Sequence, residues 1–266
     1  MKTALLILFR ILLMLSPTSV KIALLILLLL GATISANAQK FPNIQQVSLR
    51  APADIKIDGK ATEWGDTFQA YNSAIEIFYT ICNDTENLYF IAHSKEPVVI
   101  QKIIYGGITL TLKSVAKKSP VAPVSITYPL APYPYNAMSG STLRTPGTLT
   151  DSAVLAFNKQ ISDHIKTIPV TGVKEIPDSS VSVYNDQGIK SAQLIDSKKN
   201  YTYELAMPLK YLQQMIDATG TFVYIIQVNG LDTKGKIVIG GSSTSNPQEA
   251  PVAHGTSFFY GLAHLL

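Results

Sequence analysis

The clearest structural pattern in the chain spans two neighbouring segments, IKIDGKATEWGD at residues 55–66 and IEIFYTICNDTENLYFIAHSKEP at residues 75–97. In the second segment, the runs 75–82 and 88–94 are rich in Ile, Phe and Tyr, and the residues between them are all polar. These runs favour β-strands, and the polar connection favours a hairpin with a longer loop. In the first segment, Ile55 and Ile57 before Asp58-Gly59 predict a short strand that ends in a turn.

These motifs, in this order, resemble the beginning of the family 9 carbohydrate-binding modules and the related DOMON-like β-sandwiches. The matching positions are Ile57-Asp58-Gly59, Trp64, the hairpin from Asn83 to Tyr89, and Glu96-Pro97. The resemblance implies an all-β, antiparallel, jelly-roll-like sandwich that covers about residues 47–262 as a single domain. It also implies that Asp58, Gly59 and Trp64 are structural, and that Trp64 packs against the sandwich.

The first 38 residues have the features of a cleaved signal peptide. Lys21 precedes the apolar run Ile22–Leu30, and Ala36-Asn37-Ala38 is a small-x-small cleavage site. We therefore expect export of residues 39–266 to the periplasm or the cell exterior. No lipoprotein anchor is expected, because no Cys lies near this site. Translation from Met14 would leave an ordinary leader. The alternative, a two-helix membrane anchor, is disfavoured because a span needs roughly 20 apolar residues.

Composition narrows the classes of partner. The chain has 266 residues, 47% of them hydrophobic, which is enough for one sizeable core. Three of the 22 basic residues lie in the leader, so 19 basic residues stand against 18 acidic ones in the remainder. Nucleic-acid binding is not expected, because it would call for a clustered basic face. A stable membrane span is not expected once the leader is removed. Cys82 is the only cysteine, which excludes an intramolecular disulfide and favours a buried small hydrophobe.

The remainder of the chain predicts more strands and one short helix. Strands are expected at Thr109–Leu112, Ser152–Phe157, Val181–Tyr184, Ile189–Ile195, Tyr201–Met207, Phe222–Asn229, Lys236–Gly240 and Gly255–Leu262. Gly106-Gly107 indicates a bend or a close backbone approach. The helix is expected near residues 208–219, opened by Pro208 and closed by Gly220. Residues 117–147, rich in Pro and Tyr, are expected to form a long insertion over the sandwich.

The resemblance also implies where a sugar would bind. In sugar-binding members, two Trp residues clamp a terminal sugar, one before the strand that matches Ile108–Leu112 and one in the loop before the last strand. Here the first region has only Tyr105 as an aromatic, and the second, residues 245–251, has none. Thr109 and Ile237 stand where the family has an acidic residue and an Arg. Gln227 keeps a polar ligand position, and Asn229 also fits the pattern.

Replacement aromatic platforms are expected on the insertion. Tyr128, Tyr133 and Tyr135 lie among prolines that would stiffen the loop, so their rings would lose little entropy on binding. The alternative is a surface loop held by its own Tyr rings. The sequence therefore predicts Gln227, Asn229, Tyr105, Tyr133 and Tyr135 as site residues.

Metal and haem signals are weak. Structural calcium is common in the family, but Asp66, Asp84 with Glu86, and Asp186 lack the dense spacing of a calcium loop, so no metal site is assigned. Some DOMON-like sandwiches bind haem through Met and His. The candidates after the leader form no recognisable pair: His93, His164, His254, His264, Met138, Met207 and Met215.

No catalytic motif is present: there is no nucleophile elbow, zinc-protease helix, phosphate loop or dinucleotide fingerprint. We therefore expect a protein that is not an enzyme and needs no cofactor. The expected function is binding of a saccharide through an atypical site. The first alternative is an envelope structural or protein-interaction domain that has lost sugar binding, and the second is a haem-binding DOMON-like domain.

Overall fold

The computed structural model describes residues 41–65, 67–116, 118–130, 140–231, 237–238 and 257–264. Several sequence-based predictions lie outside these ranges. They are the signal peptide 1–38 with Met14, and the candidates Asp66, Tyr133, Tyr135, Met138 and His254.

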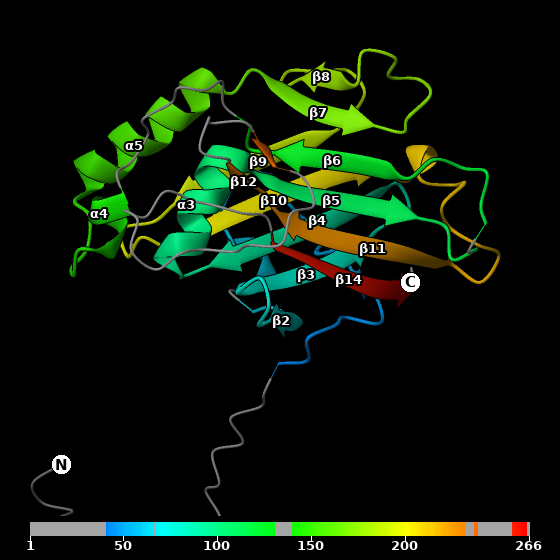
Figure 1. Ribbon diagram of the computed structural model, residues 1–266, viewed down its shortest axis with the longest axis horizontal. Helices are drawn as coiled ribbons and strands as arrows, with labels where there is room; N and C mark the ends of the chain where they lie inside the picture. The colour runs from blue at the N-terminus through cyan, green and yellow to red at the C-terminus, as the bar shows by residue number, and fades with distance from the viewer. Residues whose placement is uncertain are drawn as a thin grey trace, which may run out of the picture. The chain divides into compact units, whose positions relative to one another are not determined.

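Two six-stranded sheets lie face to face and confirm the predicted β-sandwich. Figure 1 shows β11, β5 and β6 of one sheet in front of β3, β4 and β10 of the other. Sheet I has the order β1-β3-β4-β10-β9, with β2 beside β3, and sheet II has the order β14-β11-β5-β6-β7-β8. The pairing of β1 with β3 is parallel, and the other strand pairs in the described chain are antiparallel. The jelly-roll-like strand connection stays a prediction.

The strands of sheet I are β1 (Leu49–Arg50), β2 (Ala70–Asn72), β3 (Ile77–Asn83), β4 (Asn87–Ser94), β9 (Lys190–Ile195) and β10 (Tyr201–Pro208). Those of sheet II are β5 (Ile108–Lys113), β6 (Val124–Tyr128), β7 (Thr167–Thr171), β8 (Ser180–Ser182), β11 (Thr221–Val228) and β14 (Ser257–His264). A small pair, β12 (Gly230–Leu231) and β13 (Ile237–Val238), stands apart. The helices α3 (Pro97–Gly106), α4 (Gly140–Arg144) and α5 (Asp151–His164) gather at one end of the sandwich (Figure 1).

The main core fills the space between the sheets. Alternation places Ile108, Leu110 and Leu112 of β5 inside, whereas Thr109 and Thr111 are only half-buried. The predicted hairpin is confirmed, since β3 and β4 pair antiparallel with Cys82 opposite Tyr89. Cys82 is buried and free.

β10 is buried on both faces. Its inner face contributes Tyr201, Tyr203, Leu205 and Met207 to the main core. Its outer face is covered by a second apolar cluster on sheet I: Ala61, Trp64, Cys82, Tyr89, Ile91 and Ala206, with Ile55 and Ile57 packed against it. The segment 55–64 therefore acts as a cover over the middle of sheet I.

Two predicted strands are wrong. Ile55 and Ile57 lie in an irregular segment, because they pack on the outer face of sheet I instead of pairing at its edge. Residues 152–157 belong to α5, which begins at an N-cap, Thr150, whose hydroxyl accepts from the Ala153 N–H at 3.3 Å. Only Phe157 and Ile161 of α5 are buried, at helical i, i+4 spacing.

Helix α3 begins at Pro97, and a proline is tolerated in the first turn because the N–H that it lacks would have no partner within the helix. Its buried residues Val99, Ile100, Ile103 and Ile104 repeat with the helical period. The expected close backbone approach at Gly106-Gly107 is present. A Cβ on Gly106 would lie 2.8 Å from the Asn229 backbone carbonyl, and one on Gly107 would lie 2.4 Å from the Pro129 oxygen.

The interpretation of residues 117–147 as an insertion over the sandwich is partly wrong. Residues 124–128 form β6, which lies inside sheet II between β5 and β7. The predicted helix near 208–219 is also shorter than expected. A 3-10 turn, η2 (Leu209–Tyr211), is followed by turns, although Leu212 and Met215 are buried as the apolar spacing requires.

None of the helices in the described part of the chain has the length and apolar character needed to cross a lipid bilayer.

Candidate functional site

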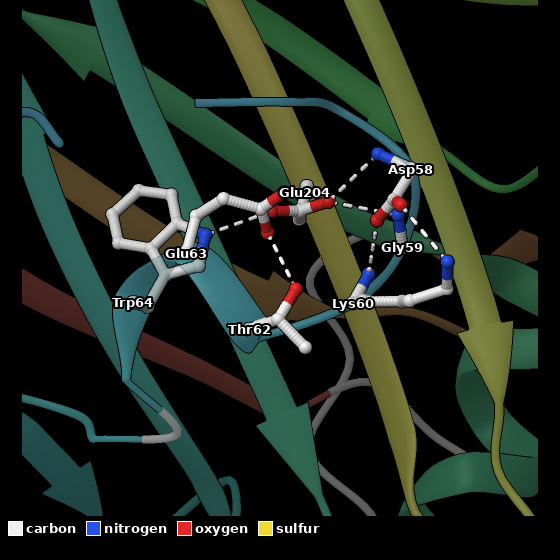
Figure 2. A network of polar contacts seen from close by, with 7 residues as sticks. All are labelled: Asp58, Gly59, Lys60, Thr62, Glu63, Trp64 and Glu204. Atoms are coloured by element: carbon white, nitrogen blue, oxygen red, sulfur yellow. Dashed lines mark hydrogen bonds and ion pairs between the residues drawn. The ribbon is translucent and has the colours of Figure 1, made fainter. Parts of the chain in front are cut away.

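Glu204 of β10 fastens the 55–64 cover to sheet I. Figure 2 shows its carboxyl between the Trp64 indole on one side and the Asp58-Gly59 backbone on the other. Oε1 accepts from Trp64 Nε1 at 2.8 Å, and Oε2 accepts from the backbone N–H groups of Gly59 at 2.7 Å and Asp58 at 2.9 Å. Burial raises the pKa of this carboxyl, and the three hydrogen bonds oppose that shift only in part. We call Asp58, Gly59, Trp64 and Glu204 the clasp.

Gly59 allows the cover to approach sheet I closely. Its φ is +85°, in the left-handed region, and a Cβ would lie 2.6 Å from the carbonyl carbon of Gln193 in β9. A side chain at this position would therefore push the two clasp N–H groups away from Glu204.

A groove of about 510 Å³ opens beside the clasp on the outer face of sheet I. It is lined by Ile55, Lys56, Ile57, Asn87, Tyr89, Gly188, Lys190 and Ala206. The two isoleucines and Ala206 supply apolar surface. The amide of Asn87 and the ammonium groups of Lys56 and Lys190 supply hydrogen-bond donors. The clasp positions one wall of the groove, since Ile55 and Ile57 directly precede Asp58.

The strand pairing explains why distant residues line this groove. Ala206 of β10 lies opposite Tyr89 of β4 and Lys190 of β9, so the three side chains share one face of the sheet. Asn87 starts β4, and its amide lies 3.4 Å from the Tyr89 hydroxyl. That hydroxyl donates to Asp84 Oδ2 at 2.8 Å, which fixes the Tyr89 ring at the edge of the groove.

Gln227 and Asn229, predicted from the resemblance, lie together on sheet II. Gln227 Nε2 donates to Asn229 Oδ1 at 2.7 Å. Asn229 Nδ2 donates in turn to the Gly106 carbonyl at 2.8 Å and to Thr109 Oγ1 at 3.0 Å. The amide of Asn229 is therefore committed to fastening the end of α3 to β5. Gln227 is half-buried, and its side-chain oxygen has no hydrogen-bond partner in the described chain.

Sheet II carries a ladder of hydroxyl groups next to Gln227. Thr109 and Thr127 share a hydrogen bond of 2.7 Å, and Thr111 and Ser125 share one of 2.8 Å. Both pairs lie on the outer face of β5 and β6, and each hydrogen bond joins residues that stand opposite each other on the two strands. The hydroxyl groups satisfy one another, so this face is a weaker candidate for ligand binding than the groove.

The two described tyrosine candidates differ in position. Tyr105 is half-buried on α3, directly before Gly106, whose carbonyl is held by Asn229. Tyr128 is a core residue instead of a loop platform. It is only 7% exposed, its ring stacks on Tyr203 with centroids 5.7 Å apart, and burial raises its pKa to about 12. The prediction of Tyr128 as a platform is wrong because β6 lies within the sheet.

Aromatic rings also gather on the outer face of β2 and β3. Phe78 contacts Tyr71 at 4.4 Å and Phe41 at 5.4 Å between ring centroids, and Phe68 stacks on His93 at 5.1 Å. His93 Nδ1 lies 3.1 Å from Thr202 Oγ1. The rings pack in edge-to-face, tilted and stacked pairs, and these contacts hold the start of the described chain on sheet I.

The metal and haem candidates whose side chains the structure describes do not converge. No group of three or more His, Cys, Asp or Glu side chains suited to a metal ion occurs in the described ranges. Both Asp84 oxygens serve the β3–β4 turn, through the N–H groups of Glu86 and Asn87 and the Tyr89 hydroxyl. Met207 lies in the main core, whereas His93 lies opposite Thr202 on the outer face, so these two face away from each other.

Comparisons of the sequence with protein-family models and with curated proteins find no match. The groove residues Lys56, Asn87 and Lys190 had no signal in the sequence, because they come from three separate segments. Glu204 had a weak signal, as the single charged residue in the strand Tyr201–Pro208.

Proposed function

We propose that residues 41–266 form a non-catalytic domain that binds a saccharide in the groove beside the clasp. The observation that carries this proposal is the composition of the groove, which combines an apolar floor with polar groups at its rim. A pyranose ring has the same division, since its CH face is apolar and its hydroxyl groups need hydrogen-bond partners. The volume of about 510 Å³ is within the range of small-molecule sites.

The rigid construction of the groove supports the same proposal. Its walls rest on β4, β9 and β10, and the segment that carries Ile55 and Ile57 is held by the clasp. A preformed site binds with a smaller loss of conformational entropy than a site that must order itself. Burial raises the pKa of Tyr89, the tyrosine in the groove lining, to about 12, so its hydroxyl stays protonated at neutral pH.

A glycan array followed by calorimetry with the best glycan tests this proposal. Asn87→Ala removes a rim amide from the groove, and we expect at least about a tenfold loss of affinity. Gln227→Ala is the matched control, because it removes a side-chain amide from sheet II, and it should leave the affinity unchanged. Thermal unfolding of both variants checks that the fold is kept.

Three results would count against the proposal. If the wild-type domain binds no glycan, saccharide binding is excluded and the structural or protein-interaction alternative stands. If Gln227→Ala loses affinity and Asn87→Ala does not, the sugar binds on sheet II and the groove is excluded. A Soret band in the purified protein would instead favour the haem-binding alternative.

A further inference from the structure

The groove carries positive charge that the described chain leaves unneutralised. Lys56 and Lys190 both line it, and no acidic side chain does. The ion pairs in the described ranges are Lys60 with Asp58 and Lys159 with Asp163, so neither groove lysine has an ion-pair partner there.

The nearby acidic groups have other partners or positions. Asp58, next to the groove wall, binds Lys60 Nζ at 3.1 Å through Oδ2 and the Lys60 N–H at 3.0 Å through Oδ1. The Asp84 carboxylate accepts hydrogen bonds from the N–H groups of Glu86 and Asn87 and from the Tyr89 hydroxyl. Burial raises its pKa, but these hydrogen bonds have the larger effect, so the pKa is lowered. Glu86 and Asp186 are exposed in the neighbouring turns and do not line the groove.

The two lysines come from different walls. Lys190 extends from β9 on the face that it shares with Ala206, and Lys56 lies between Ile55 and Ile57 on the cover. Both side chains are exposed, so their stems can follow the apolar floor while the ammonium groups stay in water. A ligand seated on the floor would therefore meet a cation from each wall.

We infer that the groove selects an acidic saccharide, with Lys56 and Lys190 binding the carboxylate of a uronic acid. This inference rests on the proposed saccharide-binding function. A bare anion would use the two cations but leave the apolar floor unused, whereas a uronate uses both. Exposed ion pairs contribute modestly and are screened by salt, so we expect a preference of about fivefold to tenfold over a neutral sugar, weakening as ionic strength rises.

The test compares trigalacturonate and a glucuronate-containing disaccharide with their methyl esters, which keep the rings and remove the charge. Calorimetric titrations are done at about 0.05 M and about 0.5 M sodium chloride. The variant is Lys56→Gln with Lys190→Gln. The matched control is Lys174→Gln with Lys198→Gln, two exposed turn lysines remote from the groove lining. We expect wild type and control to prefer the acids at low salt, and the groove variant to bind acid and ester alike.

Four outcomes would overturn the inference. Equal binding of acid and ester by wild type would exclude charge selection and leave the saccharide-binding function standing. A preference that survives in the groove variant would place the anion elsewhere. Binding of acetate or inorganic phosphate as tight as that of trigalacturonate would indicate a bare anion site. Failure of every saccharide, neutral or acidic, would remove the proposed function together with the inference.

Discussion

Gly59 shows how one residue controls the fit of the cover on sheet I. We predict that Gly59→Ala destabilises the domain by about 3 kcal/mol, because a left-handed φ and a collision with the Gln193 backbone add together. Gly147→Ala is the matched control, since its φ is +100° but no atom lies within 4 Å of the added Cβ. It should cost only the backbone strain, about 1 kcal/mol. Urea unfolding of both variants measures the difference, and equal losses would show that Gly59 is needed only for its φ.

The cover is an element whose stability depends on Glu204. We predict that Glu204→Gln lowers the free energy of unfolding by about 2 kcal/mol near neutral pH. In the wild type, the N–H groups of Asp58, Gly59 and the Trp64 indole all donate to carboxyl oxygens, whereas the amide of Gln would turn its own N–H groups toward some of these donors. Urea unfolding measures the loss. Glu86→Gln, at an exposed position in the β3–β4 turn, should leave stability unchanged.

The pH dependence of this element has a defined sign. The pKa of Glu204 is raised in the folded state, so the unfolded chain releases this proton at lower pH than the folded chain does. The contribution of Glu204 is therefore fully present below the unfolded pKa and is lost as pH rises through the folded pKa. We expect the stability difference between wild type and Glu204→Gln to shrink as the pH rises above 4.5, the ordinary pKa of a Glu carboxyl. A stability difference that grows with pH would mean that the hydrogen bonds lower the pKa of Glu204 more than burial raises it.

At the scale of the whole molecule, Tyr79 of β3 and Tyr224 of β11 connect the two sheets. Their hydroxyls lie 2.9 Å apart, and both accept from the Gln45 N–H at 3.2 Å. We predict that Tyr79→Phe and Tyr224→Phe each destabilise by about 1 kcal/mol, with a coupling energy of about 1 kcal/mol in a double-mutant cycle. Calorimetric unfolding of the four proteins measures it. Additive losses would show that the hydroxyls act independently.

Local pattern predicted the parts of the fold in which neighbours in sequence are neighbours in space. The β3–β4 hairpin, β5, β9, β10 and β11 follow from apolar runs and turn residues. Errors arose where one local signal concealed another. Ser152–Phe157 contains residues compatible with a strand, but the Thr150 cap and the Phe157–Ile161 spacing make it helical. Val124–Tyr128 was obscured by the surrounding prolines, although its own alternation is that of a half-buried strand.

The sequence by itself determined most of the β-strands, because apolar runs and turn chemistry act over a few residues, and the sandwich class was implied by its resemblance to known sandwich modules. The resemblance also marked Asp58, Gly59 and Trp64 as structural residues, without indicating their partner. Only the tertiary structure decided what these residues do, since Glu204 lies about 140 residues further along the chain and meets them through strand pairing. The groove was likewise decided by tertiary structure, because Lys56, Asn87 and Lys190 share a face only when β4, β10 and β9 pair in register and the clasp holds the cover beside them.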